Sequence, residues 1–219
     1  MVDSSGRAKR PAPAKRPGAG GRPLGAWRIP AAIIAAFVVV GVAYGVFMLS
    51  GGSGGDPGPK TYSDPEFGFT FQYPDAWKAT KRSGSAQKGG ALVSVVDPKG
   101  GKTKSGYVDS ATVAVAWAGP QTEATPGDAG VASSIADLKA SFPDVALTGP
   151  LHAAAIGAKS GWSWSYTYTQ ETVPVKVSFY WLVDGNTAYG VTFKSSAEHE
   201  AADAAVFSGI LSSFTFPSD

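Results

Sequence analysis

The sequence predicts an α+β fold, an antiparallel β-sheet packed against helices, preceded by one transmembrane helix. Three observations predict it. An uncharged apolar run covers residues 29–49, apolar and small or polar residues alternate in several stretches of residues 61–219, and two segments there place apolar residues at helical spacing. We therefore expect one globular domain at 61–219, joined to the apolar run through a Gly- and Pro-rich linker at 50–60.

The N-terminal tail, residues 1–28, is basic and rich in Pro, Gly and Ala, and it has no periodicity, which is typical of a disordered segment. It carries seven Lys or Arg and one Asp, a net charge of +6. The rest of the chain has 12 basic and 16 acidic residues, a net charge of −4. Because the positive excess lies next to an apolar segment and outside the domain, we expect no nucleic-acid partner.

The apolar run is long enough to cross a hydrocarbon layer about 30 Å thick at about 1.5 Å per residue. The basic tail before it predicts a cytoplasmic N-terminus and an extracytoplasmic domain on a single-pass cell-membrane protein, with the lipid bilayer as a partner. A cleaved secretory signal is the competing interpretation, but the run is long for one and no clear small-x-small cleavage site follows. Gly41 and Gly45 form a GxxxG pattern that suits a homodimer through this helix, although Gly/Ala-rich composition produces the same pattern by chance.

Alternation predicts the strands of the domain. The first covers 67–73, where every second residue is Phe or Tyr, and further strands are expected at 92–96 and 111–117. Between 161 and 194 three alternating stretches follow one another, and Asp184-Gly185-Asn186 marks a hairpin between the last two. They predict an antiparallel meander with one aromatic face and one small, polar face.

Two helices are predicted to cover the aromatic face. The first begins at a capping box over 125–128 and continues with apolar residues at helical spacing up to Phe142. The second begins near Ser195 and carries an apolar stripe that ends at Phe214. The aromatic run Trp162, Trp164, Tyr166 and Tyr168 also suits ligand stacking, but a place in the core explains it more simply.

The segment GFTFQYPDAW, from Gly68 to Trp77, resembles the beginning of PsbP-like domains, and the closing segment from Tyr189 to Phe216 resembles their end. The resemblance covers most of 62–216 and implies an antiparallel sheet between helices, as in the PsbP subunit of photosystem II and in LpqN-type actinobacterial envelope lipoproteins. Members of this family are mostly non-catalytic and act in binding or assembly. This chain has no cysteine to lipidate, and the apolar run takes the place of that anchor.

No residue pattern indicates catalysis, a metal site or a cofactor. The chain has no cysteine and only two histidines, His152 and His199, neither at zinc-ligand spacing. No phosphate-binding glycine loop lies between a strand and a helix. We therefore expect solvated or structural histidines, and no cofactor.

The expected function is that of a membrane-anchored, non-enzymatic binding or assembly module of the cell envelope, which binds an envelope protein or ligand. The less apolar face of the sheet supplies the candidate contact residues: Lys176, Tyr180, Thr192 and Lys194. Two alternatives stay open. One is an envelope hydrolase with an unidentified Ser or carboxylate site, and the other is a small-molecule or lipid carrier, which requires a cavity between sheet and helices.

Overall fold

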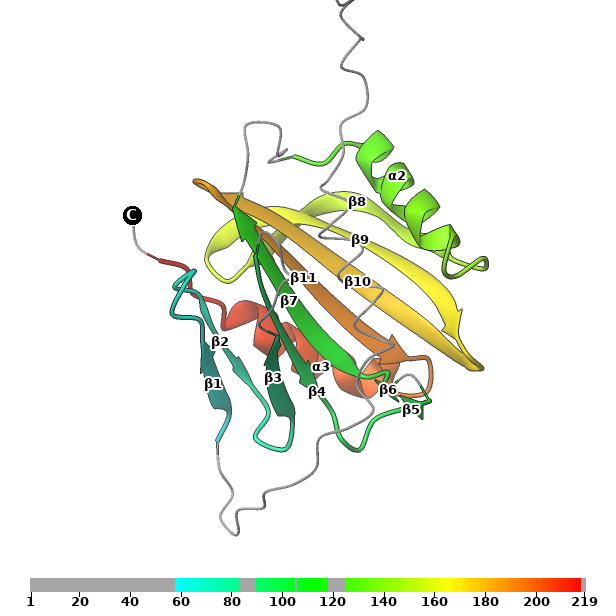
Figure 1. Cartoon of the computed structure of the whole chain (residues 1–219), viewed down its shortest axis with the longest axis horizontal. Coiled ribbons are helices and arrows are strands. Elements are labelled where there is room, and N and C mark those ends of the chain that lie inside the picture. The colour runs from blue at the N-terminus through cyan, green and yellow to red at the C-terminus, as the bar shows by residue number, and fades with distance from the viewer. Residues whose placement is uncertain (1–57, 83–89, 105, 118–124, 218–219) are drawn as a thin grey trace, which may run out of the picture.

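The computed structural model describes residues 58–82, 90–104, 106–117 and 125–217. A seven-stranded antiparallel sheet in the order β3-β4-β7-β11-β10-β9-β8 forms its centre (Figure 1). Its strands, in chain order, are β3 Lys78–Arg82, β4 Gly90–Val96, β7 Ser110–Trp117, β8 Ala146–Ile156, β9 Lys159–Gln170, β10 Val173–Asp184 and β11 Thr187–Ser196. Two small hairpins, β1 Lys60–Ser63 with β2 Thr70–Tyr73 and β5 Lys102–Thr103 with β6 Gly106–Tyr107, accompany the sheet.

Two helices cover opposite faces of this sheet. Helix α2 (Asp128–Lys139) packs over β8 and β9, and helix α3 (Glu200–Ser212) passes behind the sheet in Figure 1. The prediction that both helices cover one aromatic face is therefore wrong. The α+β class and the meander β9-β10-β11 are as expected from the alternation.

The strand register explains why both faces need cover. Phe179 on β10 lies opposite Thr192 on β11, and Val177 lies opposite Lys194. Because directly opposed residues of an antiparallel pair point to the same face, Phe179 of β10 points to one face, and Phe193 of β11 points to the other face together with Tyr180 of β10. Each face of the meander is thus partly aromatic, and each needs a helix.

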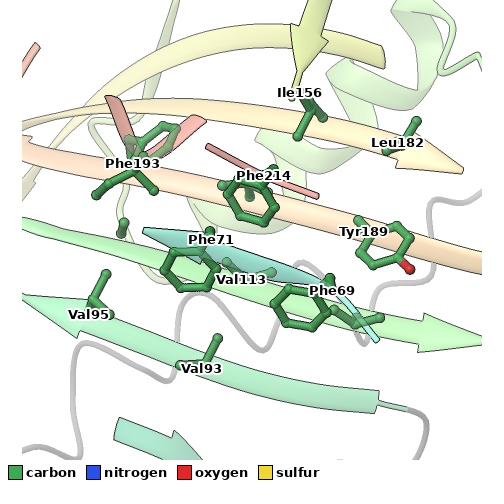
Figure 2. Packing of buried hydrophobic residues seen from close by; sticks show 14 of the residues in the cluster. Phe69, Phe71, Val93, Val95, Val113, Ile156, Leu182, Tyr189, Phe193 and Phe214 are labelled. Carbon is green, nitrogen blue, oxygen red and sulfur yellow. The ribbon is translucent and has the colours of Figure 1, made fainter. Parts of the chain in front are cut away.

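Two hydrophobic cores result, one on each side of the sheet. Three residues of the aromatic run of β9, Trp164, Tyr166 and Tyr168, are buried in the core under α2, whereas Trp162 is only partly buried and belongs to neither core. The core on the α3 side joins the hairpin β1-β2 to the sheet and the helix. Figure 2 shows Phe69, Phe71 and Phe214 gathered in this second core, and the ring centroids of Phe71 and Phe214 lie 5.0 Å apart.

The helix boundaries differ from those predicted. Helix α2 has Gly127 at its N-cap and no side-chain capping hydrogen bond, so the expected capping box does not form. Strand β11 continues to Ser196, and α3 begins at Glu200. Ser195 therefore belongs to the sheet, where its side chain is buried.

The prediction of a transmembrane helix is not supported by the helices of the described residues. The two helices of the described residues have 12 and 13 residues, and neither has the length and apolarity of a membrane span. At 1.5 Å per residue each is shorter than a hydrocarbon core of about 30 Å. The single-pass topology and the cell-membrane location expected from such a helix are not supported. The segment 29–49, with Gly41 and Gly45, lies outside the described residues.

Candidate functional site

A groove of about 240 Å³ opens between α3 and the sheet. Strands β10 and β11 form its floor and α3 forms its wall, because the helix contributes residues at spacings of three and four from one face. The lining residues are Lys176, Ser178, Tyr180, Phe193, Ser195, Glu200, Ala204, Phe207, Ser208 and Leu211. The groove therefore combines an apolar side with hydroxyl groups and one pair of opposite charges.

Aromatic rings form the apolar side of the groove. Phe193 on β11 stacks on Phe207 of α3 at a centroid distance of 4.7 Å, and Tyr180 of β10 meets Phe193 edge to face at 5.6 Å. Phe207 and Leu211 are only half-buried, although they pack against the core on this side. A ligand in the groove would thus find partly exposed apolar surface that can be buried further.

An ion pair closes one end of the groove. Lys176 Nζ bonds the carboxylate of Glu200, the first residue of α3, and both side chains are nearly half exposed, at 40% and 46%. A second hollow of about 220 Å³ lies beyond this pair and shares both residues with the groove. Asp144 also lines the second hollow, where its carboxylate accepts a hydrogen bond from the backbone N–H of Thr169 at 2.8 Å. The side-chain and backbone hydrogen bonds of Thr169 hold the pKa of Asp144 below its ordinary value.

The four contact candidates from the sequence separate into two pairs. Lys176 and Tyr180 both line the groove on the α3 side. Thr192 and Lys194 point to the opposite face, as the register of β10 and β11 requires. The structure therefore brings together the first pair and does not join the second pair to it. Contact of any of them with a partner stays a prediction.

Lys194 lies in a polar cluster on the α2 side of the sheet. Its Nζ donates to Gln170 Oε1 at 3.1 Å, and Gln170 Nε2 donates to Thr103 Oγ1 at 2.9 Å. Burial lowers the pKa of Lys194 to about 8, against the opposing field of Asp109. Thr192, two residues away on the same face, is buried, at 7% exposure.

The structure also pairs His199 with a carboxylate. Asp109, just after the hairpin β5-β6, is completely buried and lies 2.6 Å from His199 Nδ1. Its carboxylate accepts two further bonds of 2.6 Å from the backbone N–H groups of Gly101 and Ser196. Burial alone would raise the pKa of Asp109, but these hydrogen bonds outweigh it and lower the pKa. The same carboxylate raises the pKa of His199.

This pair does not extend to a nucleophile. The nearby Ser195 hydroxyl donates to Asp203 Oδ2 at 2.5 Å, and no hydrogen bond among the described residues joins a serine hydroxyl to the His199 ring. A serine hydrolase needs its nucleophile bonded to the histidine that carries out base catalysis. His152 lies exposed on β8 with its Nδ1 2.9 Å from the carbonyl oxygen of Pro150. Within 58–217, leaving out the undescribed gaps, no three His, Asp or Glu side chains gather to hold a metal ion.

Sequence reasoning missed most of the groove. Alternation on β10 identifies Lys176 and Tyr180 as one face, but the contribution of α3 depends on where that helix begins. Its apolar stripe was readable, whereas Glu200, Ala204 and Ser208 give no local signal of a binding site. Asp109 and His199 lie 90 positions apart, and only the fold brings them together.

Neither the known protein-family models nor the curated proteins contain a match to this chain. Several solved structures are similar to it. Cyanobacterial PsbP (CyanoP) from Synechocystis sp. PCC 6803 aligns over 76% of this chain and 98% of its own, with a TM-score of 0.53 and 16% sequence identity. LpqN of Mycobacterium tuberculosis, involved in cell envelope biogenesis, aligns over 74% of this chain and 94% of its own, with a TM-score of 0.44 and 14% sequence identity. The Saccharomyces cerevisiae Ran-binding protein Mog1p aligns over 72% of this chain and 95% of its own, with a TM-score of 0.45 and 9% sequence identity.

The similarity to CyanoP covers the described domain almost completely. At 16% identity it shows the fold alone and transfers no activity. The expectation from the segments at Gly68–Trp77 and Tyr189–Phe216 is confirmed at this level. The chain has a PsbP-like fold.

Proposed function

We propose that the domain is a non-catalytic binding module whose partner occupies the groove between α3 and strands β10 and β11. The groove carries the proposal, because it joins partly exposed apolar side chains to a small number of polar groups. Such a combination is typical of binding sites. The aromatic rings of Tyr180 and Phe207 supply contact area, and Lys176 and Glu200 supply orientation.

Two features support binding over catalysis. The hydroxyl of Ser195, the buried one of the three serines that line the groove, is engaged by Asp203. The imidazole of His199 uses Nδ1 to hold Asp109, a carboxylate that also fixes two backbone N–H groups. Both arrangements connect β11 to the beginning of α3, so they stabilise the groove wall.

The proposal is tested by blocking the groove from its exposed side. Ala204 and Ala205 are neighbouring exposed residues of α3, but only Ala204 lines the groove. Ala204→Trp therefore fills the groove, and Ala205→Trp is the matched control. The full-length chain carries a photocrosslinking amino acid in place of Ser208, another lining residue, and is irradiated in its native cells.

The expected result is a crosslinked product that disappears with Ala204→Trp and persists with Ala205→Trp. Circular dichroism of both variants checks that the fold is intact. Equal crosslinking in both variants, or no product from position 208 in the unblocked protein, would contradict the proposal.

A further inference from the structure

The sizes of the two hollows indicate what kind of ligand fits them. The groove and the second hollow measure about 240 and 220 Å³, and they meet at the Lys176–Glu200 ion pair. Each is smaller than the roughly 300–1,000 Å³ of a typical small-molecule pocket. Two adjacent hollows of this size suit neighbouring side chains of one polypeptide segment.

The position of β10 excludes one mode of peptide binding. Strand β10 pairs with β9 on one side and β11 on the other, so its backbone groups are already used within the sheet. A segment in the groove cannot extend the sheet there by strand addition, which requires an exposed edge. Recognition must therefore come from side chains.

The charges of the two hollows favour a cation. Their lining contains two carboxylates, Glu200 and Asp144, and one ammonium group, Lys176. Because the Lys176–Glu200 pair is nearly half exposed, it contributes little net stability, and its Lys176 can be replaced by a cation from the ligand.

We propose that the ligand is a segment of a partner protein in which a lysine or arginine stands next to an apolar residue. The apolar side chain lies against Phe207 and Leu211 in the groove, and the cation pairs with Glu200 at the boundary of the second hollow. The inference depends on the proposed function, since it names the partner of the same groove. It also predicts opposite effects for the two members of the ion pair.

The test uses three blocked tripeptides as probes: acetyl-Leu-Lys-Leu-amide and the same peptide with Gln or Glu at the centre. They are titrated into the ¹⁵N-labelled full-length chain, and amide shifts of Ser178, Tyr180 and Ser208 are followed by NMR. The Lys peptide should bind about two- to fivefold more tightly than the Gln peptide, the size of effect expected for one partly exposed charge pair. The Glu peptide should bind most weakly.

Variants of Lys176 and Glu200 test which charge of the ion pair attracts the peptide and which opposes it. Glu200→Gln should weaken binding of the Lys peptide to the level of the Gln peptide, whereas Lys176→Met should strengthen it because Glu200 loses its internal competitor. Asp137→Asn, on the exposed side of α2, is the matched control and should change nothing. The two pair variants report on opposite charges, so a fold defect in one leaves the other as a test.

The outcomes separate the two proposals. Equal binding of all three peptides at the groove residues keeps the groove as the site and overturns the charge inference. Tightest binding of the Glu peptide, strengthened by Glu200→Gln, would assign the groove to an acidic segment instead. If none of the peptides moves the groove resonances, this inference fails, while the crosslinking of position 208 still decides the proposed function.

Discussion

Asp109 joins three parts of the chain through one buried carboxylate: the turn at Gly101, the end of β11 at Ser196 and the start of α3 at His199. The pH dependence of this contact follows from the two pKa shifts. Asp109 has a lowered pKa, so its contribution is present above its ordinary value of 3.8 and is lost as the pH falls through the lowered pKa. His199 has a raised pKa, so its contribution is full below 6.5 and is lost as the pH rises through the raised pKa.

The pair should therefore stabilise the domain most between about pH 4 and pH 6.5. Glu198, Asp203 and Lys194 lie near it and affect the same titrations, Glu198 and Asp203 by raising the pKa of His199. His199→Ala should lower the free energy of unfolding in this window, and the difference from the natural protein should shrink as the pH rises above 6.5. Urea denaturation from pH 4 to pH 9 measures it. His152→Ala, at the exposed histidine of β8, is the control, and a similar profile for both variants would contradict the role of the pair.

Asp109→Asn tests the same contact from its buried side. The amide replaces one of the two carboxylate oxygens with an NH₂ donor, which then faces the backbone N–H of either Ser196 or Gly101, where the carboxylate now accepts. We expect the free energy of unfolding to fall by about 2–4 kcal/mol, as for other buried, hydrogen-bonded charges. Denaturation at pH 6 measures it, and a loss below about 1 kcal/mol would show that the carboxylate charge is not needed.

Lys194 should have the opposite pH dependence. Its pKa of about 8 in the folded protein lies below the ordinary 10.5, so the unfolded chain binds more protons between these values and stability rises with pH across them. Lys194→Met keeps the length of the side chain and removes the buried ammonium group. The variant should be at least as stable as the natural protein at pH 7, and its stability should no longer rise between pH 8 and pH 10. Thermal unfolding over this range measures it, with Lys60→Met as an exposed control.

At the residue scale the sequence supports predictions only where a local pattern exists. Alternation correctly places Lys176 and Tyr180 on one face of β10. It places Thr192 and Lys194 on the wrong face, because the face to which a residue of β11 points depends on the register with β10. That register sets Thr192 opposite Phe179 and Lys194 opposite Val177. The Asp109–His199 contact has no local signal at all.

At the scale of elements, the turn between β8 and β9 docks on the end of α3. Gly157 N–H donates to Leu211 O at 2.9 Å, and Gly157 has a φ of +57°. A Cβ at this position would lie 2.0 Å from the carbonyl oxygen of Phe214, which is backbone and cannot move aside cheaply. The turn therefore fixes the helix that forms the groove wall.

Gly157 and Gly185 have similar backbone conformations, so alanine substitutions at both positions distinguish the cost of losing the contact with α3 from the cost of backbone strain. Gly185 has a φ of +54°, but a Cβ added there would meet open space within 4 Å, so Gly185→Ala should cost about 1 kcal/mol, the penalty of the left-handed conformation alone. Gly157→Ala adds the clash and should cost about 3 kcal/mol or more. Chemical denaturation of both variants measures the difference, and equal losses would show that the contact with Phe214 contributes nothing.

Strand β8 was missed from the sequence for a physical reason. Strand β8 contains Ala153, Ala154 and Ala155, so its two faces do not differ in hydrophobicity and no alternation is visible. It is an edge strand with register shifts around Gly149. The meander β9-β10-β11 was predictable because large aromatic residues alternate with small ones along each strand. The pairing of β11 with β7 was not, because it joins segments about 75 positions apart through contacts that no local pattern encodes.

For the molecule as a whole, the seven-stranded sheet is shared by two cores, one under α2 and one on the α3 side. Val177 belongs to the first and Phe71 to the second, and both are buried. Because the sheet connects the cores, we expect them to unfold together. Val177→Ala and Phe71→Leu should each lower the free energy of unfolding by about 1–3 kcal/mol, and their effects should add in the double variant.

The indole NMR signals of Trp77 and Trp164 allow each core to be followed separately, since Trp77 lies in the core on the α3 side and Trp164 in the core under α2. In a urea titration both native signals should disappear at the same midpoint, in the natural protein and in both variants. If Phe71→Leu moved the midpoint of Trp77 alone, the hairpin β1-β2 and α3 would form a separately unfolding layer. The groove between α3 and the sheet would then open before the sheet itself unfolds, whereas a common midpoint would show that the groove persists until the whole domain unfolds.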